Sequence, residues 1–311
     1  MSNILITGAS GFVGAYLSKK LSSNGNTVVG IVRDIIPSDW LNNALGKTII
    51  VRGDIRDIKL LKRVIAHYDI DQVYHIAAAA QVKSAWKDPI DTFDSNVMGT
   101  LTLFEAIRSV DTKNKIKVVV LETDKCYGEK MDAVESDRYI ESEPYATSKI
   151  CQALITRSYI KTYGMNLKMM HSINIFGYDP LNSRLIGNVV KDCIRGINPV
   201  IRKNDKSIRE YVYVDDAVDS LIRIMNDKTL TKSVYHIYTG WVYNQEDIIL
   251  EILSQFPILA PIYDNVEIPY QIQNETLSSE NWEWKPSLTF EDALQKTIRT
   301  YIEYRYEWDR S

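Results

Sequence analysis

The sequence predicts an α/β fold built on a doubly wound parallel sheet, with a smaller region toward the C-terminus. Short runs rich in β-branched residues alternate with segments whose apolar residues recur every three or four positions. This alternation is typical of a parallel sheet with helices on both faces. A glycine-rich turn after the first run, and a length of 311 residues that can bury a sizeable core, point to the same fold.

The repeating units are clearest before about residue 173. The segments expected to be strands are Ile4–Thr7, Thr27–Val32, Thr48–Val51, Gln72–Ala77, Lys117–Thr123 and Leu167–Ile173. The segments expected to be helices are Gly11–Leu21, Ile58–His67, Asn96–Val110 and Tyr145–Tyr163. Because each helix separates two strands, the strands are expected to run in one direction.

Beyond about Asn174 the alternation loosens. Phe176–Ser183 is expected to be a loop, and Asn198–Arg209 is polar and turn-rich. Helical patterns return at Asp215–Met225, Gln245–Leu253 and Phe290–Tyr301. We assign residues 1–173 and 211–242 to the main domain, and residues 174–210 and 243–311 to a smaller region over the carboxyl edge of its sheet.

Composition excludes several functional classes. The 37 basic and 40 acidic residues are interspersed and give a net charge of −3, which argues against nucleic acid as a partner. No apolar run reaches the ~18–20 residues that span a bilayer, and the chain opens on a strand pattern without a leader. The 3 cysteines and 4 histidines are scattered, so neither a disulfide framework nor a metal site is expected. We expect a cytoplasmic protein without metal or membrane.

The glycine-rich turn contains Gly8, Gly11 and Gly14 between the first strand and the first helix. Glycines at this place make a tight turn and let the backbone approach a pyrophosphate. The free amides of the helix N-terminus favour its negative charge. The turn therefore predicts a dinucleotide site.

The second strand bears on the choice of dinucleotide. Sites for NAD usually carry an acidic residue at its end, which bonds the ribose hydroxyls, but Val32 and Arg33 stand here. Arg33 could clamp a 2′-phosphate, which favours NADP. A solvated Arg33 neutralised by Asp34 is the alternative, and it leaves NAD open.

Tyr145 and Lys149 stand four residues apart, on one face of the expected helix. A tyrosine titrates near 10, whereas a general base works best nearer the ambient pH. A neighbouring ammonium favours the phenolate, and a shift of about 3 units corresponds to about 4 kcal/mol. Thr123, at the end of the preceding strand, could share the substrate's proton. The three residues predict oxidation of a sugar hydroxyl.

These motifs, taken together, resemble the extended short-chain dehydrogenase/reductases, the NAD-dependent epimerase/dehydratase family, over essentially the whole chain. Further segments that carry the resemblance are His75–Ala78, Asn174–Gly177, Arg209–Asp215 and Trp284–Leu294. The resemblance implies a Rossmann-type domain, a nucleotide-sugar substrate and a homodimer formed through Asn96–Val110 and Tyr145–Tyr163. His171 departs from it, because relatives often carry arginine there.

The resemblance also implies which residues bind each ligand. Those implied at the cofactor are Gly8, Gly11, Phe12, Val13, Gly14, Arg33, Asp54, Ile55, Ala77, Ala78, Asn96, Tyr145 and Lys149. Those implied at the substrate are Ser84, Asn174, Arg184, Asn188 and Arg209. Within these sets Asp54 is expected at the adenine amino group, and Asn174 and Arg209 at the pyrophosphate.

Asp124 and Lys125, directly after Thr123, bear on the reaction. An elimination needs one group that donates a proton and one that accepts it. The run Thr123–Tyr127 resembles the nucleotide-sugar 4,6-dehydratases, above all those that act on CDP-glucose. If Lys125 is the base, its pKa must be strongly lowered; a purely structural Asp124–Lys125 pair is the alternative.

We therefore expect a 4,6-dehydratase that oxidises carbon 4, removes water across carbons 5 and 6, and returns hydride to carbon 6. Its catalytic residues would be Thr123, Asp124, Lys125, Tyr145 and Lys149. Its 4-keto-6-deoxy product would serve surface polysaccharide synthesis. A 4-epimerase or reductase of the same family is the nearer alternative, and a non-catalytic dinucleotide-binding regulator is the more remote one.

Overall fold

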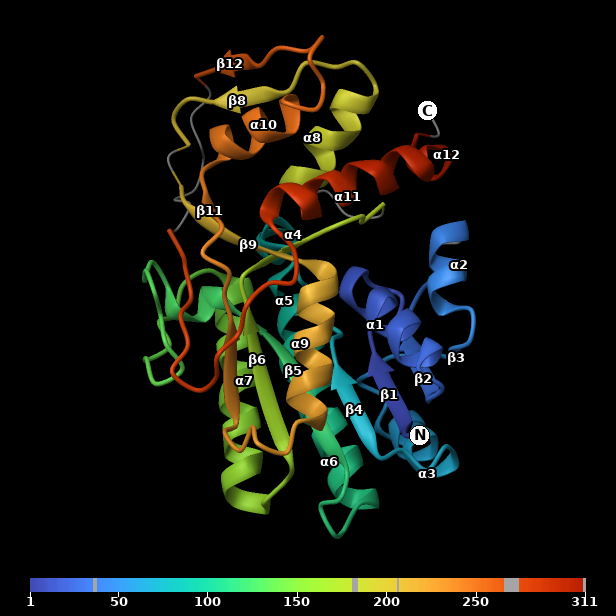
Figure 1. Cartoon of the computed structure of the whole chain (residues 1–311). Coiled ribbons are helices and arrows are strands. Elements are labelled where there is room, and N and C mark those ends of the chain that lie inside the picture. The colour runs from blue at the N-terminus through green and yellow to red at the C-terminus, as the bar shows by residue number, and fades with distance from the viewer. Residues whose placement is uncertain (36–37, 181–183, 206, 266–273, 310–311) are drawn as a thin grey trace.

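The computed structural model describes residues 1–35, 38–180, 184–205, 207–265 and 274–309, and it confirms the parallel sheet (Figure 1). All neighbouring strands of the seven-stranded sheet are parallel, so their carboxyl ends share one edge. In pairing order the strands are β10 (Val234–Ile237), β6 (Leu167–Ser172), β5 (Lys117–Thr123), β4 (Gln72–His75), β1 (Asn3–Thr7), β2 (Thr27–Val32) and β3 (Ile49–Arg52). Ligands of such sheets bind outside the carboxyl edge.

Helices cover both faces of this sheet, and each face has its own core. One face is covered by α3 (Ile58–His67), α6 (Gly99–Val110) and α7 (Pro144–Tyr163). The other is covered by α1 (Phe12–Ser23), α2 (Asp39–Leu45) and α9 (Val214–Asn226). Within β1, Leu5 joins the first core, and Ile4 and Ile6 join the second. Burial on both sides explains why the inner strands are largely apolar, whereas β3 at the edge is only partly buried.

Local contacts position the helix that carries Tyr145 and Lys149. Glu143 precedes it, and its carboxylate accepts the backbone N–H groups of Tyr145 and Ala146. Pro144 takes the first helical position, where no N–H is needed. The cap therefore fixes the backbone at the residue expected to be the base.

The helix expected from Asn96 begins differently. A π-helical turn, η1 (Asp94–Met98), precedes α6, and Asn96 lies within it. The Thr100 hydroxyl donates to the Asn96 carbonyl at 2.6 Å. Such turns are frequent at functional sites.

The smaller region lies over the carboxyl edge (Figure 1). Outside the seven-stranded sheet, the described strands are β7 (Asn174–Phe176), β9 (Arg209–Tyr213) and β11 (Val242–Tyr243) in one sheet, and β8 (Val200–Arg202) with β12 (Ile262–Asp264) in another; β9 and β11 span the boundaries expected between the two regions. The helices of the smaller region are α8 (Leu185–Ile194), α10 (Gln245–Leu253), α11 (Phe290–Glu303) and α12 (Arg305–Trp308). Short segments near the cleft are α4 (Val82–Lys87), α5 (Pro89–Phe93) and η2 (Asp124–Tyr127).

The structure corrects the expectations for this second half. Asn198–Arg209, expected to be turn-rich, contains β8, because a strand of 3 residues is too short to show alternation. β10 was not expected either, although its 4 residues are buried. The expected loop Phe176–Ser183 starts inside β7, and its residues 181–183 lie outside the described residues.

Candidate functional site

A cleft lies at the carboxyl edge of the main sheet, between the sheet and the smaller region. The structure brings most of the expected site residues together along its walls. Those that line it are Gly8, Gly11, Phe12, Val13, Gly14, Arg33, Asp54, Ile55, Ala77, Ala78, Thr123, Asp124, Lys125, Tyr145, Lys149, Asn174, Arg184 and Arg209. Among the described lining residues, the expected Ser84, Asn96 and Asn188 are missing.

The glycine turn forms a cradle that only glycines permit. Gly8 has a φ of +74°, and a Cβ there would approach the Ala77 Cα to 2.8 Å. A Cβ on Gly14 would overlap the Gly8 carbonyl oxygen. The Gly11 N–H donates to that oxygen at 3.0 Å, and α1 then begins without a side-chain cap or an acidic residue in its first turn. Uncapped amides behind a close backbone turn fit a dinucleotide pyrophosphate.

At the far end of the cleft, Arg33 is held by carboxylates. Its Nε lies 3.3 Å from the Asp34 Oδ2, and its Nη1 lies 3.9 Å from the Asp91 Oδ1. The Asp54 carboxylate accepts bonds from the backbone N–H and the guanidinium of Arg56, which lowers the Asp54 pKa. Arg33 thus has the acidic neighbour that the sequence suggested, and Asp54 has a cationic partner that the sequence did not suggest.

Tyr145 and Thr123 meet at the centre of the cleft. The Thr123 hydroxyl donates to the Asp124 Oδ1 at 2.9 Å and lies close to the Tyr145 phenol. Burial raises the pKa of Tyr145, and the nearby Thr123 hydroxyl opposes the rise. Tyr145, Thr123 and Asp124 therefore form a chain along which a proton can move.

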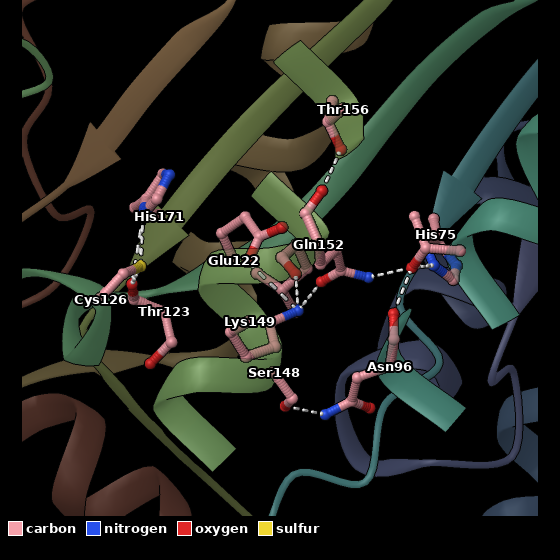
Figure 2. A network of polar contacts seen from close by, with 12 residues as sticks. His75, Asn96, Glu122, Thr123, Cys126, Ser148, Lys149, Gln152, Thr156 and His171 are labelled. Carbon is pink, nitrogen blue, oxygen red and sulfur yellow. Dashed lines mark hydrogen bonds and ion pairs between the residues drawn. The ribbon is translucent and has the colours of Figure 1, made fainter. Parts of the chain in front are cut away.

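Lys149 makes a separate set of contacts, which Figure 2 shows together with Thr123. Its ammonium donates to the Leu121 carbonyl at 2.7 Å and to the Gln152 side chain, and it lies 3.4 Å from the Glu122 Oε2. Burial raises the pKa of Glu122 to about 7, and Lys149 opposes that rise. Lys149 is thus paired with a buried carboxylate, and the sequence signal for this pair is a charged residue inside an apolar strand.

Two of the expected ligand contacts have other roles. Asn96 is buried; its Oδ1 accepts the Ala79 N–H at 2.7 Å and its Nδ2 donates to the Ser148 hydroxyl at 2.8 Å (Figure 2). It therefore ties the segment after β4 to α7 behind the cleft wall. Ser84 is exposed on α4 and donates to the Gln81 side chain at 3.3 Å.

Lys125 has a partner that no motif indicates. Its Nζ lies 2.5 Å from the Oε2 of Glu275, a buried residue 150 positions away. Burial lowers the pKa of Lys125, but the Glu275 and Asp124 carboxylates raise it more, and the net shift is upward. A base at Lys125 would need a lowered pKa, and the shift here has the opposite direction.

The substrate end of the cleft carries two guanidinium groups. Arg184 lies above the Phe12 ring, 5.5 Å from its centroid, and its Nε lies 3.3 Å from the Asp179 Oδ2. Arg209 begins β9, and Asn174 pairs with Tyr211 of the same strand and donates from its Nδ2 to the Glu210 carbonyl at 3.1 Å. Arginine suits phosphate oxygens, so this end fits an anionic ligand.

A parallel sheet with a glycine cradle and a Tyr-x-x-x-Lys helix at its carboxyl edge defines a dinucleotide-binding enzyme of the short-chain dehydrogenase/reductase type. The family model described as "NAD dependent epimerase/dehydratase family" matches residues 4–237. The chain belongs to this family.

Relatives and solved structures agree with this assignment. The chain is 27% identical over 314 residues to a dTDP-glucose 4,6-dehydratase of Mycolicibacterium smegmatis, covering 96% of this chain and 92% of the relative. It is 29% identical over 264 residues to a CDP-glucose 4,6-dehydratase of Salmonella typhimurium, covering 78% and 71%. The UDP-glucose 4-epimerase of Thermotoga maritima has the same fold, with a TM-score of 0.87, 22% identity and coverage of 97% and 99%.

The described residues form neither a membrane-spanning helix nor a cluster of metal ligands. Within the described ranges, no helix has the length and apolar character to cross a membrane. In the same part of the chain, no three or more His, Cys, Asp or Glu residues are placed to hold a metal ion.

Proposed function

We propose that this enzyme is a nucleotide-sugar 4,6-dehydratase. The observation that carries the proposal is a set of acidic and basic side chains next to Tyr145 and Thr123. Asp124 there has a buried oxygen without a hydrogen-bond partner in the described chain, and the Lys125–Glu275 ion pair lies beside it. Oxidation and return of hydride at one carbon need a single proton-transfer pair, whereas loss of water needs further acid and base groups.

The residues divide the reaction among them. Tyr145 takes the proton from the hydroxyl on carbon 4, and Lys149 stabilises the phenolate that precedes this step. Thr123 passes that proton from the nearby Tyr145 to Asp124, to which its hydroxyl already donates a hydrogen bond. Asp124 then protonates the leaving hydroxyl on carbon 6 as the C6–O bond breaks. A bound dinucleotide supplies the hydride acceptor at carbon 4 and the hydride donor at carbon 6.

The other expected contacts concern ligand binding. The glycine cradle would hold the dinucleotide pyrophosphate, and Asn174, Arg184 and Arg209 would hold that of the nucleotide sugar. We place NAD ahead of NADP, because Arg33 lies between Asp34 and Asp91 and a 2′-phosphate would have to compete with two carboxylates. The family name agrees with NAD.

We also propose a homodimer formed through α6 and α7, working in the cytoplasm on surface polysaccharide precursors. Several apolar side chains on or next to these helices are exposed, including Leu154 and Met98. Exposed apolar side chains gathered on neighbouring elements are typical of an interface between subunits.

A panel of CDP-, GDP-, dTDP- and UDP-hexoses tests the reaction. A dehydratase gives a 4-keto-6-deoxy product without net change in the dinucleotide. A product that differs only in configuration at carbon 4 and keeps its 6-hydroxyl would make the enzyme a 4-epimerase, like the structurally similar protein of Thermotoga maritima.

A further inference from the structure

Glu275 is a buried carboxylate in the cleft wall that comes from a segment remote from the other site residues. Its N–H donates to the Ile208 carbonyl, and its backbone bridges to Arg209 at the start of β9. The side chain lines the cleft although only 2% of it is exposed. Its Oε2 accepts from Lys125, whereas its Oε1 has no hydrogen-bond partner among the described residues. A buried oxygen without a partner is costly, and beside a cleft it indicates a ligand contact.

The charges around Glu275 suit a proton acceptor. Lys125, Asp124 and Arg209 face it. Burial raises the Glu275 pKa and Asp124 adds to the rise, whereas Lys125 and Arg209 lower it. The net shift is upward, toward the range in which a general base works best. Lys125, whose pKa is also raised, keeps its proton and is a poor base.

We propose that Glu275 removes the proton from carbon 5 of the sugar, with Lys125 as the cation that holds it in place. This inference rests on the proposed 4,6-dehydratase function. The C5–H bond is acidic once carbon 4 is a ketone, and its proton goes to the Glu275 Oε1. The electron pair forms the C5–C6 double bond, the C6–O bond breaks, and Asp124 donates the proton that turns the leaving hydroxyl into water.

The same residue completes the cycle. After hydride has returned to carbon 6, Glu275, whose proton exchanges with solvent while the intermediate is bound, gives a proton back to carbon 5. The proton lost by Asp124 is replaced through Thr123 from Tyr145, which took it from the carbon 4 hydroxyl. The sum is the loss of one water, with no net oxidation.

Deuterium exchange tests the assignment with whichever nucleotide hexose the wild type converts. In deuterium oxide, wild-type product should carry deuterium at carbon 5. Glu275→Gln should lower dehydration and carbon 5 exchange by roughly 10²- to 10⁴-fold, the usual contribution of a general base. Reduction of the bound nicotinamide in a single turnover, followed by its absorbance, should persist, because carbon 4 oxidation does not need Glu275.

Glu280→Gln is the matched control, since Glu280 is an exposed glutamate on the same segment. It should behave as wild type. Glu275→Asp, which keeps the carboxylate, should recover part of the exchange, and circular dichroism should show both Glu275 variants folded. Exchange at the wild-type rate in a folded Glu275→Gln protein would overturn the assignment while leaving the dehydratase in place. A wild type that never forms a 4-keto-6-deoxy product would overturn both.

Lys125→Met separates Glu275 from Lys125 as the base. With Glu275 as the base, exchange persists in this variant. Its acid limb moves to higher pH, because the cation that lowers the Glu275 pKa is gone. Loss of exchange at every pH in Lys125→Met, with Glu275→Gln still active, would assign the step to Lys125.

Discussion

At the scale of single residues, the site is governed by buried charges held in pairs. Glu122 and Lys149 form one pair and Glu275 and Lys125 the other, and each glutamate has a pKa raised by burial. Both Glu122 oxygens lack a hydrogen-bond partner in the described chain, so its single ion pair only partly offsets desolvation. Neither glutamate belongs to a motif. The sequence can mark Glu122 only as a charge inside the strand KVVVLET.

Glu122 should make the fold less stable as the pH rises. Its pKa is about 7 in the folded chain, above the ordinary value of 4.5, so between these values the folded state binds more protons than the unfolded one. Stability then falls with rising pH, by about 3 kcal/mol in all at 1.36 kcal/mol per unit. Urea unfolding from pH 4.5 to 7 should show this slope in wild type. Glu122→Gln should lose the share due to Glu122 and keep the share due to Glu275, whose pKa is raised in the same way.

Glu105→Gln provides the comparison for that measurement. Glu105 is a partly exposed carboxylate on α6, paired with Arg108, and its pKa is lowered by this partner. Its replacement should leave the falling slope in place. An unchanged slope in Glu122→Gln would show that Glu122 is not the group responsible.

Arg33 decides a second prediction at the residue scale. Asp34 and Asp91 form ion pairs with the Arg33 guanidinium, which is then not free to bind a 2′-phosphate. Wild type should therefore bind NAD more tightly than NADP. Asp34→Asn with Asp91→Asn should free Arg33 for a 2′-phosphate and strengthen NADP binding about tenfold, since a charge-assisted hydrogen bond contributes about 1.5–3 kcal/mol. Calorimetric titration measures both affinities. If wild type binds NADP more tightly than NAD, this prediction is wrong and Arg33 binds the 2′-phosphate despite its two acidic neighbours.

At the scale of elements, the turn between β1 and α1 depends on close backbone contact. A Cβ on Gly14 would overlap the Gly8 carbonyl oxygen, which is backbone and cannot swing away. Gly14→Ala should therefore distort the cradle at a cost of about 1–3 kcal/mol, or roughly 5- to 150-fold in dinucleotide affinity. Gly46→Ala, where the Cβ would meet only ordinary contacts at 3.5 Å, should bind normally. Equal dissociation constants for the two variants would contradict this account of the turn.

At the scale of the whole molecule, local pattern predicted the main domain better than the site. The strands from β1 to β6 follow from short apolar runs and helices such as α3 from apolar period, since these strands, apart from the edge strand β3, are largely buried on both faces. β8 and β10 are too short to show an alternation of apolar and polar residues, so the sequence did not predict these two strands. Motifs placed Tyr145 and Asp124 in the cleft, but a contact between Lys125 and Glu275 across 150 residues depends on tertiary structure alone.

The subunit interface gives the last prediction. Trp86 on α4, Ile90 on α5 and Leu154 on α7 are 57%, 76% and 52% exposed, and α4 and α5 both pack against α7. Burying such side chains gains about 25 cal/mol per Å², so a second copy pairing its α7 face here would be stabilised, and a charge in the centre would be left without a partner. Leu154→Arg should be monomeric by sedimentation velocity at concentrations where wild type is dimeric. Ile258→Arg, at a side chain 96% exposed in the smaller region, should stay dimeric. A monomeric wild type would contradict the dimer. A dimer that dissociates only in Ile258→Arg would show that the interface does not lie on α7.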